Sequence, residues 1–211
     1  MKGLMSISVN TSLEPAELLE RARQGSGPAL GRLLDTYAPY LSILARLQIG
    51  RKLQGKADPG DLVQETFLAA QRNFGKFRGT TEAELLSWLR QILAARLATL
   101  MRHYLGTKGR NVRLERALSI ELEQSSHALD RGFVARLSSP SHQVARREQA
   151  VLLAEAIARL PADYREVIIL RHLEELPFAE VARRLGRTLD SVEKLWVRAL
   201  AKLRRSLGGP S

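Results

Sequence analysis

The 211-residue chain has no cysteine, which excludes disulfides, thiolate nucleophiles and zinc–thiolate sites, and 45% of its residues are hydrophobic, enough to build a core. Its 33 Lys+Arg exceed its 22 Asp+Glu, a formal net charge of +11, so the surface should attract polyanions. Nucleic acid is the first candidate, because neutralised phosphates release counterions, and an anionic membrane surface is the second. Because Met1–Ser12 lacks a signal-peptide pattern and no apolar run could span a bilayer, we expect a cytoplasmic protein without a membrane partner.

Helical periodicity runs through the chain without alternating strand patterns, which predicts an all-α fold. Asp58 suits an N-cap ahead of Pro59, and Thr81 with Glu84 forms a capping-box pattern. The helices expected in the N-terminal half are Pro15–Arg23, Pro28–Leu47, Pro59–Asn73 and Glu82–Tyr104, with a loop at 74–79.

The pattern loosens between residues 106 and 145, where Ser125-Ser126 and Ser138–Ser141 are typical of a linker and Leu114–Leu122 could form only a short helix. Helices are then expected at Arg146–Leu160, Pro161–Leu173, Pro177–Leu185 and Leu189–Leu207. The sequence therefore predicts two helical modules joined by a linker. Their bounds are a tail at 1–14, a first module at 15–105, a linker at 106–145, a second module at 146–207 and a tail at 208–211.

The last two helices match a DNA-binding helix-turn-helix, with Gly186 ending the shorter helix and Thr188 capping the longer one. Apolar stripes on the two helices can close on each other, and Trp196 belongs to the inner stripe. The outer face of the second helix is basic, as entry into the major groove requires. A solvated helical hairpin with an idle basic face is the alternative. The residues expected to contact duplex DNA are Arg187, Thr188, Ser191, Lys194, Leu195, Arg198 and Lys202.

The helix that follows Asp58 carries an acidic and polar face, made by Asp61, Gln64 and Glu65. In a basic protein, an exposed acidic face favours a protein partner over DNA. The alternative is that Asp61 and Glu65 only interact with the positive end of the helix dipole, which explains Asp61 better than Glu65.

Two segments in this order resemble the extracytoplasmic-function (ECF) sigma factors of bacterial RNA polymerase. Residues 58–67 are similar to that family's core-polymerase docking helix, and residues 160–204 are similar to its C-terminal domain, which reads the minus-thirty-five promoter element. Phe77-Arg78-Gly79, followed by Trp88-Leu89, resembles the loop and helix that open and read the minus-ten element. The resemblance implies polymerase contacts at Asp61, Leu62, Gln64, Glu65 and Leu68, and minus-ten contacts at Arg78, Arg90, Arg96 and Arg102.

The partners that this resemblance implies are core RNA polymerase and promoter DNA, with an anti-sigma factor or other regulator as a further candidate. We expect no enzymatic activity, cofactor, metal or small-molecule substrate, because the acids lie on separate helices and the histidines are scattered. The main alternative is a stand-alone helix-turn-helix regulator that binds operator DNA without polymerase, and its weakness is the acidic face at residues 61–65. A helical protein of the membrane surface is a third possibility, which would need a larger exposed apolar face on the last helix.

Overall fold

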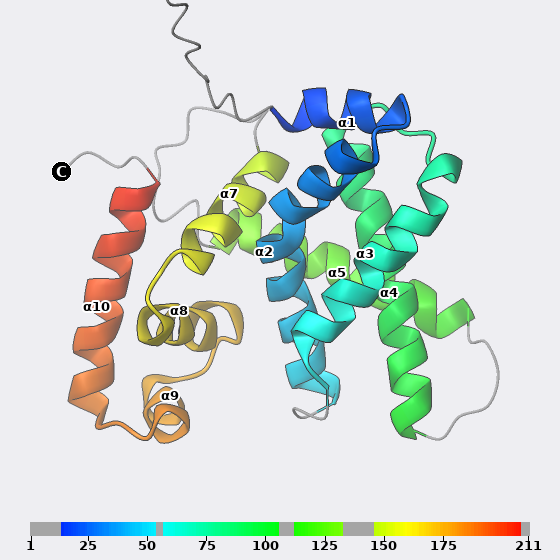
Figure 1. Ribbon diagram of the computed structural model, residues 1–211. Coiled ribbons are helices and arrows are strands. Elements are labelled where there is room, and N and C mark those ends of the chain that lie inside the picture. The colour runs from blue at the N-terminus through cyan, green and yellow to red at the C-terminus, as the bar shows by residue number, and fades with distance from the viewer. Residues whose placement is uncertain (1–13, 54–56, 106–111, 133–145, 208–211) are drawn as a thin grey trace, which may run out of the picture.

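The computed structural model describes residues 14–53, 57–105, 112–132 and 146–207, and these residues form helices and turns without a strand. The predicted all-α fold class is confirmed (Figure 1). The first half of the chain contains α1 (Pro15–Arg23), α2 (Gly27–Lys52), α3 (Pro59–Asn73), the 3-10 turn η1 (Phe74–Lys76) and α4 (Glu82–Leu105).

The starts of α3 and α4 follow from their capping residues. The Asp58 carboxylate accepts from the backbone N–H of Gly60 at 2.5 Å. Thr81 Oγ1 accepts from the N–H of Glu84 at 3.2 Å, while the Glu84 carboxylate accepts from the N–H of Thr81 at 3.0 Å. Hydrogen bonds from Thr80 and Thr81 also hold the pKa of Glu84 below its ordinary value. The predicted capping box is therefore present in both directions.

The second half departs from the expectation in two places. Its elements are α5 (Val112–Gly132), α7 (Arg146–Ala158), α8 (Ala162–Ile168), the π-helical turn η2 (Ile169–Leu173), α9 (Phe178–Leu185) and α10 (Leu189–Ser206). The single helix expected over 161–173 changes to π-helical geometry after Ile168. The larger departure is α5, which fills much of the stretch expected to be linker.

The linker interpretation of residues 112–132 is wrong because α5 is a packed helix. Leu118, Leu122 and Leu129 are fully buried along one side of α5, and Ser125 and Ser126 are buried beside them. Ser126 Oγ accepts from Tyr40 at 2.8 Å, and Ser125 Oγ accepts from Gln48 at 3.3 Å. Serines that look like linker residues in the sequence are satisfied by partners on α2.

Helix α2 lies at the centre of the molecule and is buried on several sides. It packs against α1 and α3, and also against α7 from the second half of the chain, while α5 packs on both α4 and α7 (Figure 1). Buried side chains from both halves belong to one connected apolar cluster. The two predicted modules therefore lie side by side against α5. Within the described ranges, no helix is both long and apolar enough to cross a membrane.

Candidate nucleic-acid interface and docking surface

The turn between α9 and α10 depends on one glycine. Gly186 adopts the left-handed conformation, with φ of +61°, and ends α9. The N–H of Arg187 then donates to the carbonyl of Ala182 at 3.0 Å. Thr188 caps α10, since its hydroxyl accepts from the N–H of Ser191 at 3.3 Å. The predicted short helix, glycine turn and capped long helix are thus all present.

The inner stripes of α9 and α10 close on each other as predicted. Val181 of α9 and Val192, Ala199 and Leu203 of α10 are buried. Trp196 is half-buried, with its ring 5.3 Å from that of Phe178. It therefore belongs to the core of this hairpin, as the sequence predicts.

The outer face of α10 is open to a ligand. Lys194, Arg198 and Lys202 are exposed along it, and Arg187 is exposed in the turn before the helix. Thr188 is also exposed, whereas Ser191 and Leu195 are half-buried beside the basic residues.

Two of these basic side chains already have acidic partners. Lys194 Nζ lies 2.7 Å from Asp190, and Arg187 lies 2.5 Å from Asp163. Both pairs are well exposed, so each contributes little to stability and a DNA phosphate could replace the carboxylate. Among the residues whose placement is known, Arg198 and Lys202 have no acidic partner.

Helix α3 has one buried face and one exposed face. Leu62, Val63, Thr66, Ala69 and Ala70 are buried. The exposed face consists of Asp61, Gln64, Glu65 and Leu68, and it is called the α3 docking face below. Leu68 is 49% exposed, which leaves an apolar contact point beside two carboxylates.

Leu62, to which the resemblance assigns a docking role, is buried in this structure, so that role stays an untested prediction. Its side chain is only 2% exposed, because one residue along a helix turns the side chain by about 100° from that of Asp61. It packs into the molecule's own core and is not available to another protein.

The three aromatic residues after α3 pack on one another. The ring of Phe77 lies 5.1 Å from that of Trp88 and 5.7 Å from that of Phe74. Gly79 is required beneath them, because a Cβ at this position would lie 2.3 Å from the Phe77 ring. Arg78 is exposed and is held by the carbonyl of Gly75 at 2.8 Å.

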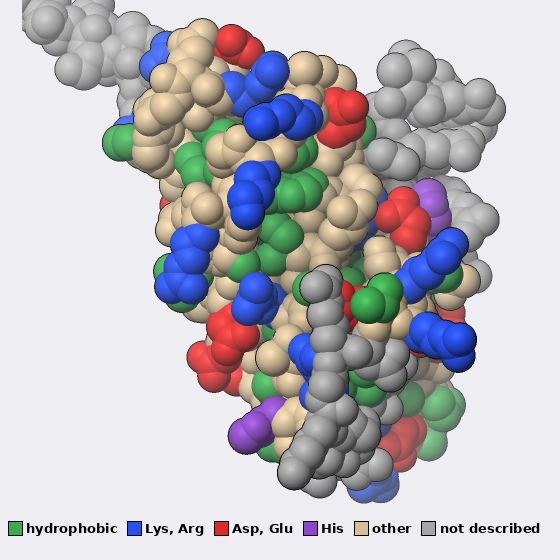
Figure 2. Space-filling model, turned by 90° about the vertical axis from the view of Figure 1, so that its right-hand side faces the viewer, with side chains coloured by type: hydrophobic (Ala, Val, Ile, Leu, Met, Phe, Trp, Pro, Cys, Tyr) green, Lys and Arg blue, Asp and Glu red, His purple; other side chains and the backbone are tan. Residues whose placement is uncertain are grey.

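A cleft of about 410 Å³ adjoins this aromatic cluster, between the loop and the turn that joins α1 to α2. Arg23 and Arg78 both line it, as do Phe74 and Phe77. Apolar rings beside guanidinium groups can receive an unpaired base and its phosphate. The side of the molecule that includes α3 and α4 carries Lys and Arg side chains scattered among apolar ones (Figure 2).

The arginines of α4 differ sharply in what they can contact. Arg90 is only 3% exposed, and it donates to Glu123 of α5 at 2.8 Å and to the Tyr40 hydroxyl at 3.0 Å. Helix α5 covers the Arg90 side chain here, and the DNA contact expected of Arg90 stays an untested prediction. Arg102 bonds to its own helix at Ala98 and Thr99. Arg96 is half-buried, and its Nε lacks a hydrogen-bond partner among the described residues.

Comparisons with known proteins cover most of the chain. The family model "Sigma-70, region 4" matches residues 150–203, from α7 to α10. The ECF RNA polymerase sigma factor BldN of Streptomyces coelicolor is 30% identical over 191 residues, covering 90% of this chain and 65% of that protein. The ECF RNA polymerase sigma-E factor of Haemophilus influenzae is 27% identical over 185 residues, covering 86% of this chain and 89% of that protein.

Residues 150–203 thus match sigma-70 region 4, and the chain is similar to ECF sigma factors over most of its length.

Two solved structures also match the chain. The RsbN–BldN complex is 24% identical, with a TM-score of 0.29, and covers 89% of this chain and 97% of that chain. The complex of CnrH with the cytosolic domain of CnrY is 24% identical, with a TM-score of 0.32, and covers 93% and 99%.

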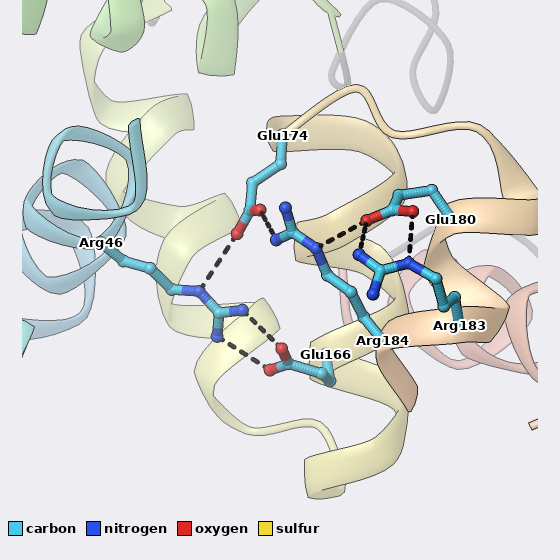
Figure 3. Close-up of polar contacts among 6 residues, drawn as sticks. All are labelled: Arg46, Glu166, Glu174, Glu180, Arg183 and Arg184. Atoms are coloured by element: carbon cyan, nitrogen blue, oxygen red, sulfur yellow. Dashed lines mark hydrogen bonds and ion pairs between the residues drawn. The ribbon is translucent and has the colours of Figure 1, made fainter. Parts of the chain in front are cut away.

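The sequence did not reveal an ionic network between the two halves of the chain. Arg46 of α2 forms two hydrogen bonds with Glu166 of α8 and also contacts Glu174, which in turn contacts Arg184 of α9 (Figure 3). Arg46 and Glu166 are 120 residues apart, so no local spacing could have paired them. The sequence signal is that Arg46 is the one charged residue between Asp35 and Arg51 of α2, in a largely apolar stretch where a charge needs a partner.

Proposed function

We propose that this chain is the sigma subunit that directs core RNA polymerase to a set of promoters. The α3 docking face would bind the polymerase, α10 would read the minus-thirty-five duplex, and the cleft beside Phe77 would handle the minus-ten strand. The observation that carries the proposal is that one chain has two exposed surfaces of opposite charge. One is the acidic and apolar face of α3, and the other is the basic outer face of α10.

The α10 surface suits duplex DNA in both shape and charge. A helix in the major groove places its N-terminal residues against base edges, here Thr188, Ser191 and Lys194, and its later cations against phosphates, here Arg198 and Lys202. Arg187 stands at the capped helix end, where backbone N–H groups also favour phosphate.

The α3 docking face suits a basic protein surface. Asp61 and Glu65 supply negative charge, and Leu68 supplies an apolar contact at the same face. Arg78, Arg96 and Arg102 remain candidates for the minus-ten strand, and the cleft between Arg23 and Arg78 is where an unpaired base would enter. Such a protein works by binding and positioning, without catalysis of its own, in the bacterial cytoplasm where polymerase and DNA meet. An anti-sigma factor or other regulator stays a prediction.

The test is co-purification with core RNA polymerase. Wild type is compared with Asp61→Arg combined with Glu65→Arg, and with a control in which Glu17→Arg and Glu20→Arg reverse two exposed charges on α1. We expect wild type and control to bind, and the α3 variant to lose most of its binding. If well-folded wild type fails to bind, the chain is a stand-alone regulator, and selection of operators from random duplex DNA becomes the next experiment.

A further inference from the structure

The outer face of α10 carries one acid that the helix itself does not explain. Glu193 is exposed on a face that otherwise presents Lys194, Arg198 and Lys202. Within the part of the chain that the structure describes, no hydrogen bond or ion pair reaches its carboxylate. Asp190, by contrast, lies in the first turn of α10 and pairs with Lys194 at 2.7 Å. Glu193 therefore needs a different explanation.

Neither capping nor the helix dipole accounts for Glu193. Thr188 is the N-cap of α10, and the acid of a capping box would stand three residues later, at the position of Ser191. Glu193 lies beyond that position, in the second turn, where the effect of the dipole has faded. Next to phosphates, its carboxylate would repel the duplex that the basic residues attract. Glu193 therefore weakens DNA binding unless it meets a hydrogen-bond donor on the DNA.

Glu193 lines a groove that lies beside the start of α9. The groove has a volume of about 450 Å³, and the rings of Phe178 and Trp196 form part of its wall. Val197 lines the same groove and is 57% exposed. It stands four positions after Glu193, so the two side chains lie on the same side of the helix. Helix α10 lies at the edge of the molecule, where a duplex can reach it (Figure 1).

The structure moves the centre of the DNA-facing stripe of α10. Ser191 and Leu195, which the sequence assigned to duplex contacts, are half-buried. The residues of α10 that are exposed and line the groove are Asp190, Glu193, Lys194, Val197 and Arg198. In a recognition helix, the N-terminal residues are the ones that contact base edges. Glu193 and Val197 both lie in the N-terminal half of α10, so they are placed to contact bases.

The major groove offers few donors to a carboxylate. Cytosine presents its N4 amino group, whereas adenine presents its N6 amino group beside the N7 acceptor. A carboxylate can only accept, so N7 repels it at adenine and cytosine is favoured. The guanine paired with that cytosine presents O6 and N7, which can receive a hydrogen bond from Lys194. The side chain of Val197 cannot form hydrogen bonds, but its methyl groups suit the C5-methyl group of thymine.

We propose that Glu193 and Val197 select the minus-thirty-five sequence. Glu193 accepts a hydrogen bond from the N4 amino group of a cytosine, and Val197 packs against the methyl group of a thymine nearby. The rise of an α-helix separates the two residues by about 6 Å, which corresponds to about two base pairs of duplex. The base contacts rest on the proposed function, since they need α10 to enter the major groove of promoter DNA.

The test is selection of duplexes by holoenzyme from a library with a randomised segment. Core polymerase is combined with wild type, Glu193→Gln or Glu193→Ala, and the bound duplexes are sequenced. Wild type should favour cytosine at one position of the motif about tenfold over the other bases. Glu193→Gln should move that preference to adenine, because an amide both donates to N7 and accepts from N6. Glu193→Ala should remove the preference there and keep the rest of the motif.

The thymine contact is tested on the DNA as well as on the protein. Val197→Ser should lose the preference for thymine at a position within about two base pairs of the cytosine. Replacing that thymine with deoxyuracil removes only the methyl group. The replacement should weaken binding by wild type about fourfold and leave binding by Val197→Ser unchanged.

A matched control and a folding check accompany the selection. Glu20→Gln removes an exposed acid from α1 and should enrich the same motif as wild type. Circular dichroism and thermal unfolding should be the same for all variants, because Glu193 and Val197 are exposed.

The possible outcomes separate this proposal from the proposed function. A motif that both Glu193 variants leave unchanged would overturn the proposal, as would a wild type that binds core polymerase but enriches no motif. A deoxyuracil effect of equal size in wild type and Val197→Ser would overturn the role of Val197. A wild type that fails to bind core polymerase counts against the proposed function instead. Selection with the free chain would then show whether Glu193 contacts a base.

Discussion

Trp196 of α10 donates a hydrogen bond from its indole Nε1 to His172 Nε2 of η2 at 2.8 Å, and the two rings stack with an interplanar angle of 24°. The indole has only one donor, and a half-buried donor is costly to leave unsatisfied. His172 therefore positions α10 through its tryptophan. The bond gives the histidine of η2 a structural role.

Replacing His172 with alanine should destabilise the C-terminal module by about 1–2 kcal/mol, because the indole donor is left unpaired and the ring stacking is removed. Urea unfolding followed by Trp196 fluorescence measures this, with Trp88→Phe removing the other tryptophan. His127→Ala on α5, where the side chain is 47% exposed, should change the unfolding free energy by less than about 0.5 kcal/mol. If the two substitutions change the unfolding free energy equally, the His172–Trp196 bond does not stabilise the C-terminal module.

Leu62 and Leu68 should have opposite roles, although both lie on α3. Leu62→Ala should cost about 2–5 kcal/mol of stability, because it empties a buried site. Leu68→Ala should change the free energy of unfolding by less than about 0.5 kcal/mol. It should weaken binding to core polymerase, because this side chain is half exposed on the α3 docking face. Thermal unfolding and a polymerase-binding titration of both variants separate the two effects. If Leu62→Ala weakens polymerase binding by more than its unfolded fraction accounts for, the assignment of Leu62 to stability alone is contradicted.

Gly79 should tolerate no side chain. An added Cβ would lie 2.3 Å from the Phe77 ring and 2.9 Å from Glu84 Cβ, so the aromatic cluster must shift. We expect Gly79→Ala to cost about 1–3 kcal/mol, as overpacking usually does. Gly75→Ala, in the same loop with no atom within 4 Å of its Cβ position, is the matched control and should be nearly neutral. Denaturant unfolding of the two variants side by side tests the difference.

The outer face of α10 should contribute to DNA affinity by binding phosphates. Lys194→Ala and Arg198→Ala should each weaken binding to promoter duplex. For each phosphate that a variant no longer binds, the slope of log affinity against log salt should become smaller by about 1. Fluorescence anisotropy over a range of salt concentrations measures both quantities. Arg21→Ala on α1 removes one positive charge far from α10 in sequence and should leave the slope unchanged. A slope that stays the same in all three variants would mean that α10 does not face the phosphates.

The contact between the modules should weaken in acid. The hydrogen bond from Arg46 holds the pKa of Glu166 below its ordinary 4.5, so the bond stabilises the folded protein at neutral pH. This stabilisation is present in full above the ordinary pKa and is lost as the pH falls through the lower pKa of the folded protein. The difference in unfolding free energy between wild type and Glu166→Gln should therefore be full at about pH 7 and shrink below about pH 4.5. Urea unfolding of both proteins, measured from about pH 7 to about pH 3.5, follows this difference. A constant difference over this range would contradict the role of the Glu166 carboxylate.

Sequence reasoning succeeded where the cause of a structure is local. The N-cap at Asp58, the capping box of Thr81 and Glu84 and the left-handed Gly186 each depend on residues a few positions apart, and all are present. The burial of Leu62 was not predicted, because helical spacing defines faces but does not show which residue at the border of a face is buried. The packing of α3 decides this, leaving Leu62 2% exposed and Leu68 49% exposed.

Sequence reasoning failed where the partner is distant in the chain. Ser125 and Ser126 resemble linker residues until Gln48 and Tyr40 are placed beside them. Arg90 belongs to a basic segment and was assigned to DNA, yet its acidic partner, Glu123, comes from a helix that the pattern did not reveal in full. The pairing of Arg46 with Glu166 joins residues 120 positions apart and follows only from the packing of α2 against the second half.

The most direct test of the account is promoter-specific transcription by a reconstituted holoenzyme. Core RNA polymerase is combined with the wild-type chain, or with Asp61→Arg plus Glu65→Arg, and run-off transcripts from a library of bacterial promoter fragments are sequenced. The account predicts transcripts from a defined set of start sites with wild type and almost none with the α3 variant. Transcription that is independent of the chain, or equal with both proteins, would contradict it.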